Sequence, residues 1–408
     1  MQSTPSPLPA DLGTPPAHTS AALWALAVGG FGIGTGEFAI MGLLPEVAKD
    51  LGVTIPQAGH VISAYALGVV VGAPLLAVLT AGWRQRRLLV VLMLVFALGN
   101  FASALAPGYA SLNLLRFLAG FPHGTYFGVA ALVAAGLAGP GQRAKAVGQV
   151  MLGLTVAVVV GVPLAAWLGQ ALGWRAGFAF VGCIGLLAAA LVFRHVPDQA
   201  PLEGASPLRE LGALLRPQVW FTLGIGAIGF GGLFSVFSYV KPTLMAEAGL
   251  AEFRVPLVLA VFGFGMVAGN VFGARLADKA LMRTVGGLLL WAALVLGLFC
   301  FTAPHLWLAV PNIFLIGTIV ALAPALQIRL MDVAGDAQAL AAALNHSAFN
   351  MANALGAWLG GIAIAAGLGW TSTGWVGTLL ALGGLVVFAG ALAVERKEKR
   401  RAKMRAVS

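Results

Sequence analysis

The chain has 408 residues, of which 60% are hydrophobic and only 9% charged, and its mean hydropathy is +0.93. These values lie outside the range of soluble globular domains. The formal net charge of +10 does not indicate a nucleic-acid-binding protein, because the basic residues are spread over short segments between apolar stretches.

The N-terminal segment 1–21 is rich in Pro, Ser and Thr and lacks the basic region that opens a cleavable signal peptide. We expect a disordered cytoplasmic tail there. Twelve apolar stretches follow, each long enough to cross roughly 30 Å of hydrocarbon as a helix. They are 22–45, 55–81, 88–106, 112–138, 147–172, 177–193, 220–240, 255–277, 284–303, 306–328, 339–366 and 374–394.

Most Lys and Arg residues fall in the segments that lie on the same side of the membrane as the N-terminus. The positive-inside rule therefore predicts that both termini are cytoplasmic. The basic tail 395–408 would then face an anionic lipid leaflet. We expect a multi-pass protein of a bacterial inner membrane, in contact with the lipid bilayer and with no nucleic-acid partner.

The polar, proline-containing segment 194–218 divides the chain into two parts with six apolar stretches each, 22–193 and 219–394. The two parts resemble one another. Gly68 and Gly72, four positions apart, lie at the end of the second stretch, and Gly265 and Gly269 lie in the same way at the end of the eighth. Parallel six-helix repeats joined by a cytoplasmic loop are typical of transporters whose substrate site lies near the midplane between the halves.

Six segments carry a resemblance to a known family: 36–45, 58–74, 116–124, 161–163, 237–242 and 323–327. Together they resemble the arabinose-efflux permease (AraJ) group of drug:proton antiporters in the major facilitator superfamily. The resemblance implies an all-α integral membrane fold of twelve helices in two six-helix halves. It further implies secondary active efflux, with the first, fourth, seventh and tenth spans lining a central cavity. Exporters of sugars, nucleosides and chloramphenicol-type drugs are all similar to this group, so the resemblance implies no particular substrate.

Glu37 is the one carboxylate found well inside an apolar stretch. Because a charged group at a helix centre costs about 2.5 to 3.5 kcal/mol to insert, such a residue is a candidate for proton coupling. Arg116 lies at a matching depth in the fourth stretch, and we expect it to hold Glu37 ionised. His123 is a candidate proton relay, and the alternative is a neutral imidazole that donates to a backbone carbonyl. For Glu37 the alternative is a permanently ionised packing partner.

Aromatic residues on the spans that flank the expected cavity could form an apolar wall for an amphipathic solute. Helix packing or lipid contact would explain such residues equally. Lys241 could be a cation in the cavity, or its amine could extend to the outer interface. The candidates for the substrate cavity are Phe38, Tyr65, Tyr126, Phe127, Phe234, Tyr239 and Lys241.

The turn after the second span contains Arg84, Arg86 and Arg87 but lacks the Asp that family members usually carry. The equivalent turn in the second half does contain an acidic residue, Asp278, which is followed by Lys279 and Arg283. We interpret both turns as gates on the cytoplasmic side, with simple membrane anchoring as the alternative for the arginines. His346, Asn350 and Asn353 share a helix face close to the cytoplasmic end and could be gate residues or interhelical hydrogen-bond partners.

We find no phosphate-binding loop and no hydrolase or metalloprotease motif, so the sequence predicts no cofactor, no metal and no enzyme. The favoured hypothesis is a monomeric, proton-coupled exporter of a small sugar-like or amphipathic, drug-like molecule that works by alternating access. A symporter or facilitator for uptake is the alternative with the same fold. A membrane sensor or membrane enzyme is a third, less favoured hypothesis.

Overall fold

The computed structural model describes residues 17–80, 82–138, 143–198, 215–334 and 338–407, and all regular structure in these ranges is helical. Twelve helical segments are long and apolar enough to span a membrane. They run over Thr19–Gly42, Ile55–Leu76, Gln85–Ala104, Tyr109–Leu137, Ala146–Leu172, Trp174–His195, Pro217–Phe237, Glu252–Ala277, Lys279–Thr302, Leu306–Ala334, Leu344–Ala365 and Ser372–Glu398. The predicted number of spans is confirmed.

The first half contains six spans and one short extra helix. Its elements are α1 (Ala17–Phe38), η1 (Ala39–Gly42), α2 (Leu44–Leu51), α3 (Ile55–Leu79), α4 (Gln85–Ala104), α5 (Tyr109–Leu137), α6 (Arg143–Val156), η2 (Ala157–Gly161), α7 (Val162–Leu172) and α8 (Trp174–His195).

The second half repeats this plan. Its elements are α10 (Pro217–Gly224), η4 (Ile225–Gly229), α11 (Gly231–Phe237), α12 (Val240–Glu247), η5 (Glu252–Arg254), α13 (Val255–Thr302), α14 (Leu306–Gly317), η6 (Thr318–Ala321), α15 (Leu322–Ala334), α16 (Gln338–Ala365) and α17 (Ser372–Val407).

Several boundaries differ from the sequence-based expectation. Helix α1 begins at Ala17, inside the segment expected to be a tail, and residues 1–16 lie outside the described residues. Helix α13 holds two predicted spans, which meet at the non-helical backbone of Ala280. Helix α17 continues without a break from the last span through the basic segment that follows it. The charged residues after the last span continue the helix, because Arg, Lys and Glu are good helix formers.

The glycine pairs noted in the sequence allow the same close helix approach in both halves. A side chain at Gly68 would meet the backbone of Phe117, and one at Gly265 would meet the backbone of Phe314. Gly265 follows Gly68 by the same number of positions as Phe314 follows Phe117, so the two contacts are equivalent in the two halves. Small residues thus bring α3 against α5 and α13 against α14, as is common where membrane helices pack closely.

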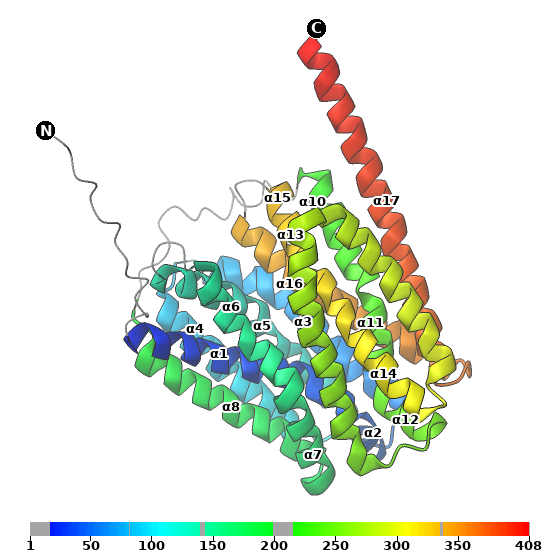
Figure 1. Cartoon of the computed structure of the whole chain (residues 1–408). Helices are drawn as coiled ribbons and strands as arrows, with labels where there is room; N and C mark the ends of the chain where they lie inside the picture. The colour runs from blue at the N-terminus through cyan, green and yellow to red at the C-terminus, as the bar shows by residue number, and fades with distance from the viewer. Residues whose placement is uncertain (1–16, 81, 139–142, 199–214, 335–337, 408) are drawn as a thin grey trace, which may run out of the picture.

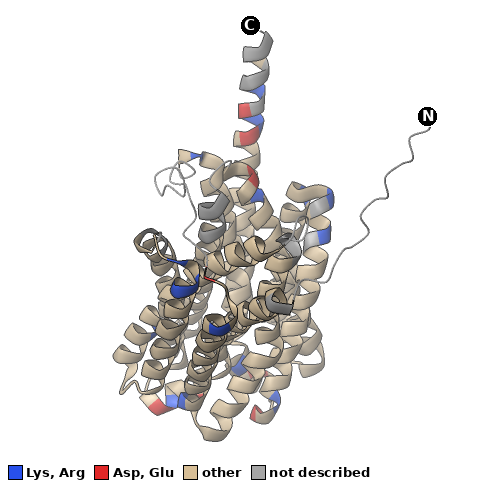
Figure 2. Cartoon of the chain, turned by 90° about the vertical axis from the view of Figure 1, so that its left-hand side faces the viewer, with Lys and Arg blue, Asp and Glu red and all other residues tan. Residues whose placement is uncertain are grey.

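The start of α1 and the end of α17 lie on one side of the molecule, which we call the terminal side, and α2, α7 and α12 lie on the opposite, far side (Figure 1). Most of the helical body is tan, and the few charged residues lie mainly near the ends of helices (Figure 2). This distribution fits a bilayer across the middle.

The halves meet along several pairs of elements, chiefly α3 with α16 and the η2–α7 segment with α13, and also α5 with α16 and α2 with α12. One hydrogen bond in the first seam runs from Ser63 Oγ to the carbonyl of Ala354 at 3.1 Å. The candidate functional site lies between these two halves.

Candidate functional site

Glu37 lies near the end of α1, and its side chain is buried with only 6% exposure. The amide nitrogen Nδ2 of Asn353, on α16, donates a hydrogen bond of 3.2 Å to Glu37 Oε1. Asn353 belongs to the second half and is itself fully buried. The buried carboxyl is therefore hydrogen-bonded across the boundary between the halves.

Arg116, on α5, is fully buried but makes no ion pair with Glu37 within the described residues. Its Nη2 donates to the carbonyl of Gly36 at 2.8 Å, and its Nη1 donates to Oδ1 of Asn100 at 3.3 Å. The guanidinium also lies 4.2 Å from the ring centroid of Tyr65. Arg116 thus holds the α1 backbone next to Glu37 through the Gly36 carbonyl.

His123, on α5, faces His346 of the second half, with ring centroids 6.3 Å apart. Its Nδ1 lies 3.3 Å from the hydroxyl of Tyr65, so its partner is a phenol and not the backbone carbonyl of our alternative interpretation. Phe127 stacks on His346 with ring centroids 5.3 Å apart. Asn350 Nδ2 donates to the His346 carbonyl at 3.0 Å. Two candidate proton carriers or gate residues therefore meet between the halves.

The predicted aromatic cavity residues divide into two groups. Phe38 stacks on Phe234 across the boundary between the halves, with ring centroids 6.2 Å apart. Tyr126 and Tyr239 instead donate through their hydroxyls to the carbonyls of Leu26 and Ala357, both at 2.8 Å. In this structure these two tyrosines lie in helix packing.

Lys241, on α12, is buried at 1% exposure, so its amine does not extend into solvent. It forms an ion pair with Glu46 of α2, in the first half, and a second one of 3.2 Å with Oε1 of Glu252. Sequence reasoning missed both carboxylates. Glu46 directly follows Pro45 in the first turn of a short helix, and an acidic residue there suits the helix N-terminus, so the sequence offered a structural explanation for it.

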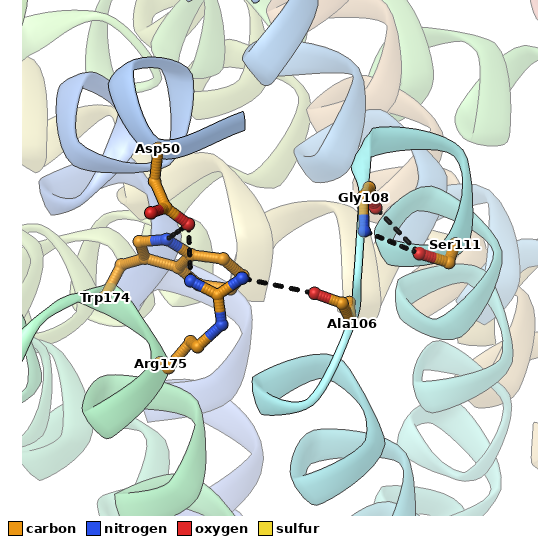
Figure 3. Close-up of polar contacts among 6 residues, drawn as sticks. All are labelled: Asp50, Ala106, Gly108, Ser111, Trp174 and Arg175. Atoms are coloured by element: carbon orange, nitrogen blue, oxygen red, sulfur yellow. Dashed lines mark hydrogen bonds and ion pairs between the residues drawn. The ribbon is translucent and has the colours of Figure 1, made fainter. Parts of the chain in front are cut away.

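A further ion pair on the far side lies within the first half. Oδ2 of Asp50, on α2, accepts from the Arg175 guanidinium and from Nε1 of Trp174, the latter at 3.0 Å (Figure 3). Arg175 also donates to the carbonyl of Ala106 at 3.3 Å. These hydrogen bonds, first from Arg175 and then from Trp174, hold the pKa of Asp50 below its usual range.

On the terminal side, Arg84 and Arg86 both face Asp198, at 2.7 Å and 3.8 Å. The acidic residue missing from this turn is therefore supplied by the segment after α8, far away in sequence. Arg87 lies over the ring of Trp83, 5.5 Å from its centroid. In the second half Lys279 and Arg283 are exposed, and the Asp278 side chain lies outside the described residues.

The chain belongs to the major facilitator superfamily, whose family model matches residues 26–335 and 234–407. It is 40% identical over 373 residues to the "Inner membrane transport protein YdhP" of Escherichia coli K12, covering 90% of this chain and 95% of that one. It is 36% identical to the "Putative transporter AraJ" of the same organism, covering 84% and 88%. It is 34% identical to a "Chloramphenicol resistance protein" of Streptomyces lividans, covering 90% and 94%.

A solved structure confirms the fold. It is a bacterial homologue of the human lysosomal transporter Spinster, with a TM-score of 0.68 and 18% identity over 94% of each chain. The family and the relatives are transporters and not enzymes, so the protein is a multi-pass inner-membrane transporter for a small molecule. The resemblance to the AraJ group is confirmed.

Proposed function

We propose that the protein exports a small sugar-like or amphipathic solute in exchange for protons, and that Glu37 is the carboxyl that couples the two movements. The single observation that carries this proposal is the hydrogen bond between Asn353 and Glu37. It places a titratable group, buried in a membrane span, at the contact between the two halves that must move during alternating access.

Protonation changes this contact without needing another residue to move. The Asn353 amide donates either to a carboxylate or to the carbonyl oxygen of a neutral carboxyl. A hydrogen bond to a charged acceptor is roughly twice as strong as one between neutral groups. Loading a proton on Glu37 therefore weakens the bond between the halves, and this is how a proton can bias a rocking equilibrium.

Arg116 serves this site through position. By donating to the Gly36 carbonyl it fixes the last turn of α1, so that the carboxyl of the next residue points at α16. His123 and His346 add a second pair of ionisable groups between the halves. We propose His123 as the relay through which the proton reaches or leaves Glu37.

The direction of transport and the substrate class draw on relatives. Besides the chloramphenicol resistance protein, a 31% identical relative from Helicobacter pylori is named "Probable sugar efflux transporter". The stacked pair Phe38 and Phe234 suits an amphipathic solute, because aromatic faces bind the apolar side of sugars and drugs. We place both termini in the cytoplasm, which makes the far side periplasmic, and we propose that a monomer is sufficient.

One proton entering across 100 mV releases about 2.3 kcal/mol, which is enough for more than a tenfold gradient of a neutral solute. The test measures retention of labelled sugars, nucleosides and phenicol-type drugs in an exporter-deficient host. The proposal predicts lower retention of one class in cells with the transporter, and loss of that difference when an uncoupler is added. If a class accumulates instead and the uncoupler lowers its level, the protein is an importer.

A further inference from the structure

A buried lysine joins the two halves on the far side of the membrane. Lys241 comes from α12 of the second half, and its partner Glu46 comes from α2 of the first. The Lys241 side chain is 0% exposed and that of Glu46 is 18% exposed, so water screens this pair little. Removing one partner of such a pair leaves the other charge buried and uncompensated. This strongly disfavours the contact between α2 and α12.

Lys241 also pairs with a second carboxylate, that of Glu252, which belongs to the same half as Lys241. Glu252 Oε1 lies 3.2 Å from the amine, and the Glu252 side chain is 52% exposed. One ammonium thus faces two carboxylates, of which only Glu46 crosses the boundary between the halves. Two carboxylates at one site disfavour each other's ionised form, so one of them takes up a proton more readily than an isolated carboxyl.

From this arrangement we infer that Glu46 is a second proton-binding residue, and that its protonation releases Lys241 to Glu252 and so unlocks the far side. The inference rests on the proposed proton coupling and extends it with a site that faces the compartment opposite the termini. When Glu46 is neutral, Lys241 keeps an ion pair within its own half. The halves then lose their charge-assisted contact, and at most a weaker neutral hydrogen bond replaces it.

The surroundings of the cluster agree with Glu46 as the group that titrates. Burial raises the pKa of Glu46, and the charge of Lys241 opposes that shift. Its second oxygen, Oε2, is buried without a hydrogen-bond partner among the described residues, so it can carry the proton. Glu46 lies in a short helix outside the membrane spans, where protons of the far-side solution can reach it.

The other charged groups nearby are engaged elsewhere or act weakly. On α2 and η5 they are Lys49, which acts on Glu252 through its charge, Asp50, which pairs with Arg175, and Arg254, which lies over the Phe253 ring. Glu247 ends α12 and makes no ion pair within the described part of the chain. A hydrogen bond from a side chain to the backbone also bridges the halves here. Gln170 Nε2 donates to the Glu252 carbonyl at 3.3 Å, and this bond does not depend on pH.

The experiment measures the width of the far side directly and needs no substrate. Spin labels are placed at Leu172 of the first half and Ala251 of the second, both exposed on the far side, after Cys183 and Cys300 are replaced by Ser. The distance distribution is recorded in lipid nanodiscs between about pH 8 and pH 5, a range in which a carboxyl of raised pKa titrates. Asp50→Asn is the matched control, because Asp50 lies on the same helix and its partner Arg175 is in the same half.

The inference predicts that wild type shifts from short to long distances as the pH falls. Glu46→Gln gives the long distance at every pH, Lys241→Met gives it at neutral pH, and Asp50→Asn titrates like wild type. A Glu46→Gln or Lys241→Met variant that stays short at neutral pH overturns the inference, as does a pH response that survives in Glu46→Gln. Because no substrate is involved, failure here is separate from failure of the Glu37 assignment, which is measured by transport.

Discussion

Asn353 on α16 and Glu37 on α1 are joined by a hydrogen bond of 3.2 Å that spans the two halves of the transporter. Both side chains are buried, and the bond connects a helix of the first half with a helix of the second. The proposed coupling of proton binding to movement rests on this contact.

Asn353→Ala removes the partner of Glu37 and leaves the fold otherwise intact. Interhelical hydrogen bonds in membranes contribute about 0.6 to 1.7 kcal/mol, so we expect transport to slow by roughly three- to twentyfold. Initial rates of solute uptake into inverted vesicles measure this. Asn345→Ala is the control, because Asn345 bonds to Gln327 within the same half at 2.6 Å, and its rate should stay close to wild type. Equal losses in both variants would contradict a special role for Asn353.

Arg116→Lys keeps the positive charge but loses the planar fork that reaches the Gly36 carbonyl and Asn100 together. Hydrogen bonds from a charged donor contribute about 1.5 to 3 kcal/mol, and we expect a loss of stability of that order. The melting temperature of the purified protein in detergent reports it. Arg87→Lys, whose guanidinium lies over Trp83 at the terminal side, should melt like wild type. If Arg116→Lys also melts like wild type, Arg116 does not fix α1.

Gly68→Ala should destabilise the first half. The added methyl group would overlap the backbone of Phe117, and backbone cannot move aside as a flexible side chain can. Overpacking of this kind costs about 1 to 3 kcal/mol. Gly148→Ala on α6 is the matched control, since nothing lies within 4 Å of the new methyl group, and it should be neutral or stabilising. Thermal melting of the two variants side by side decides between packing and a general intolerance of alanine.

Asp50 gives a stability effect that depends on pH. Its pKa is lowered in the folded protein by Arg175 and Trp174, so folding favours the ionised form. The contribution is fully present above the unfolded pKa of about 3.9 and is lost as the pH falls through the lower folded value. We therefore expect Asp50→Asn to melt below wild type at neutral pH, with the difference shrinking in strongly acidic buffer. A difference that stays constant with pH would contradict this account.

The fold was predictable because length and hydropathy alone determine which segments can cross a bilayer. Glu37 was also predictable, since a carboxylate inside an apolar span has few structural explanations. The partners of the candidate residues were not: Asn353 follows Glu37 by 316 positions, and Glu46 precedes Lys241 by 195. Such pairs arise only when the halves are docked. Asp198 was missed because folding within the first part of the chain brings it to Arg84 from the segment after α8.

The central claim is that Glu37 couples protons to transport, and Glu37→Gln tests it most directly. Glutamine keeps the size and the hydrogen bond to Asn353 but cannot exchange a proton. The measurement is solute accumulation in inverted vesicles with an imposed pH gradient, together with exchange of the same solute without a gradient. The account predicts that Glu37→Gln still exchanges solute but no longer accumulates it. If Glu37→Gln accumulates solute with the pH dependence of wild type, Glu37 is not the coupling residue.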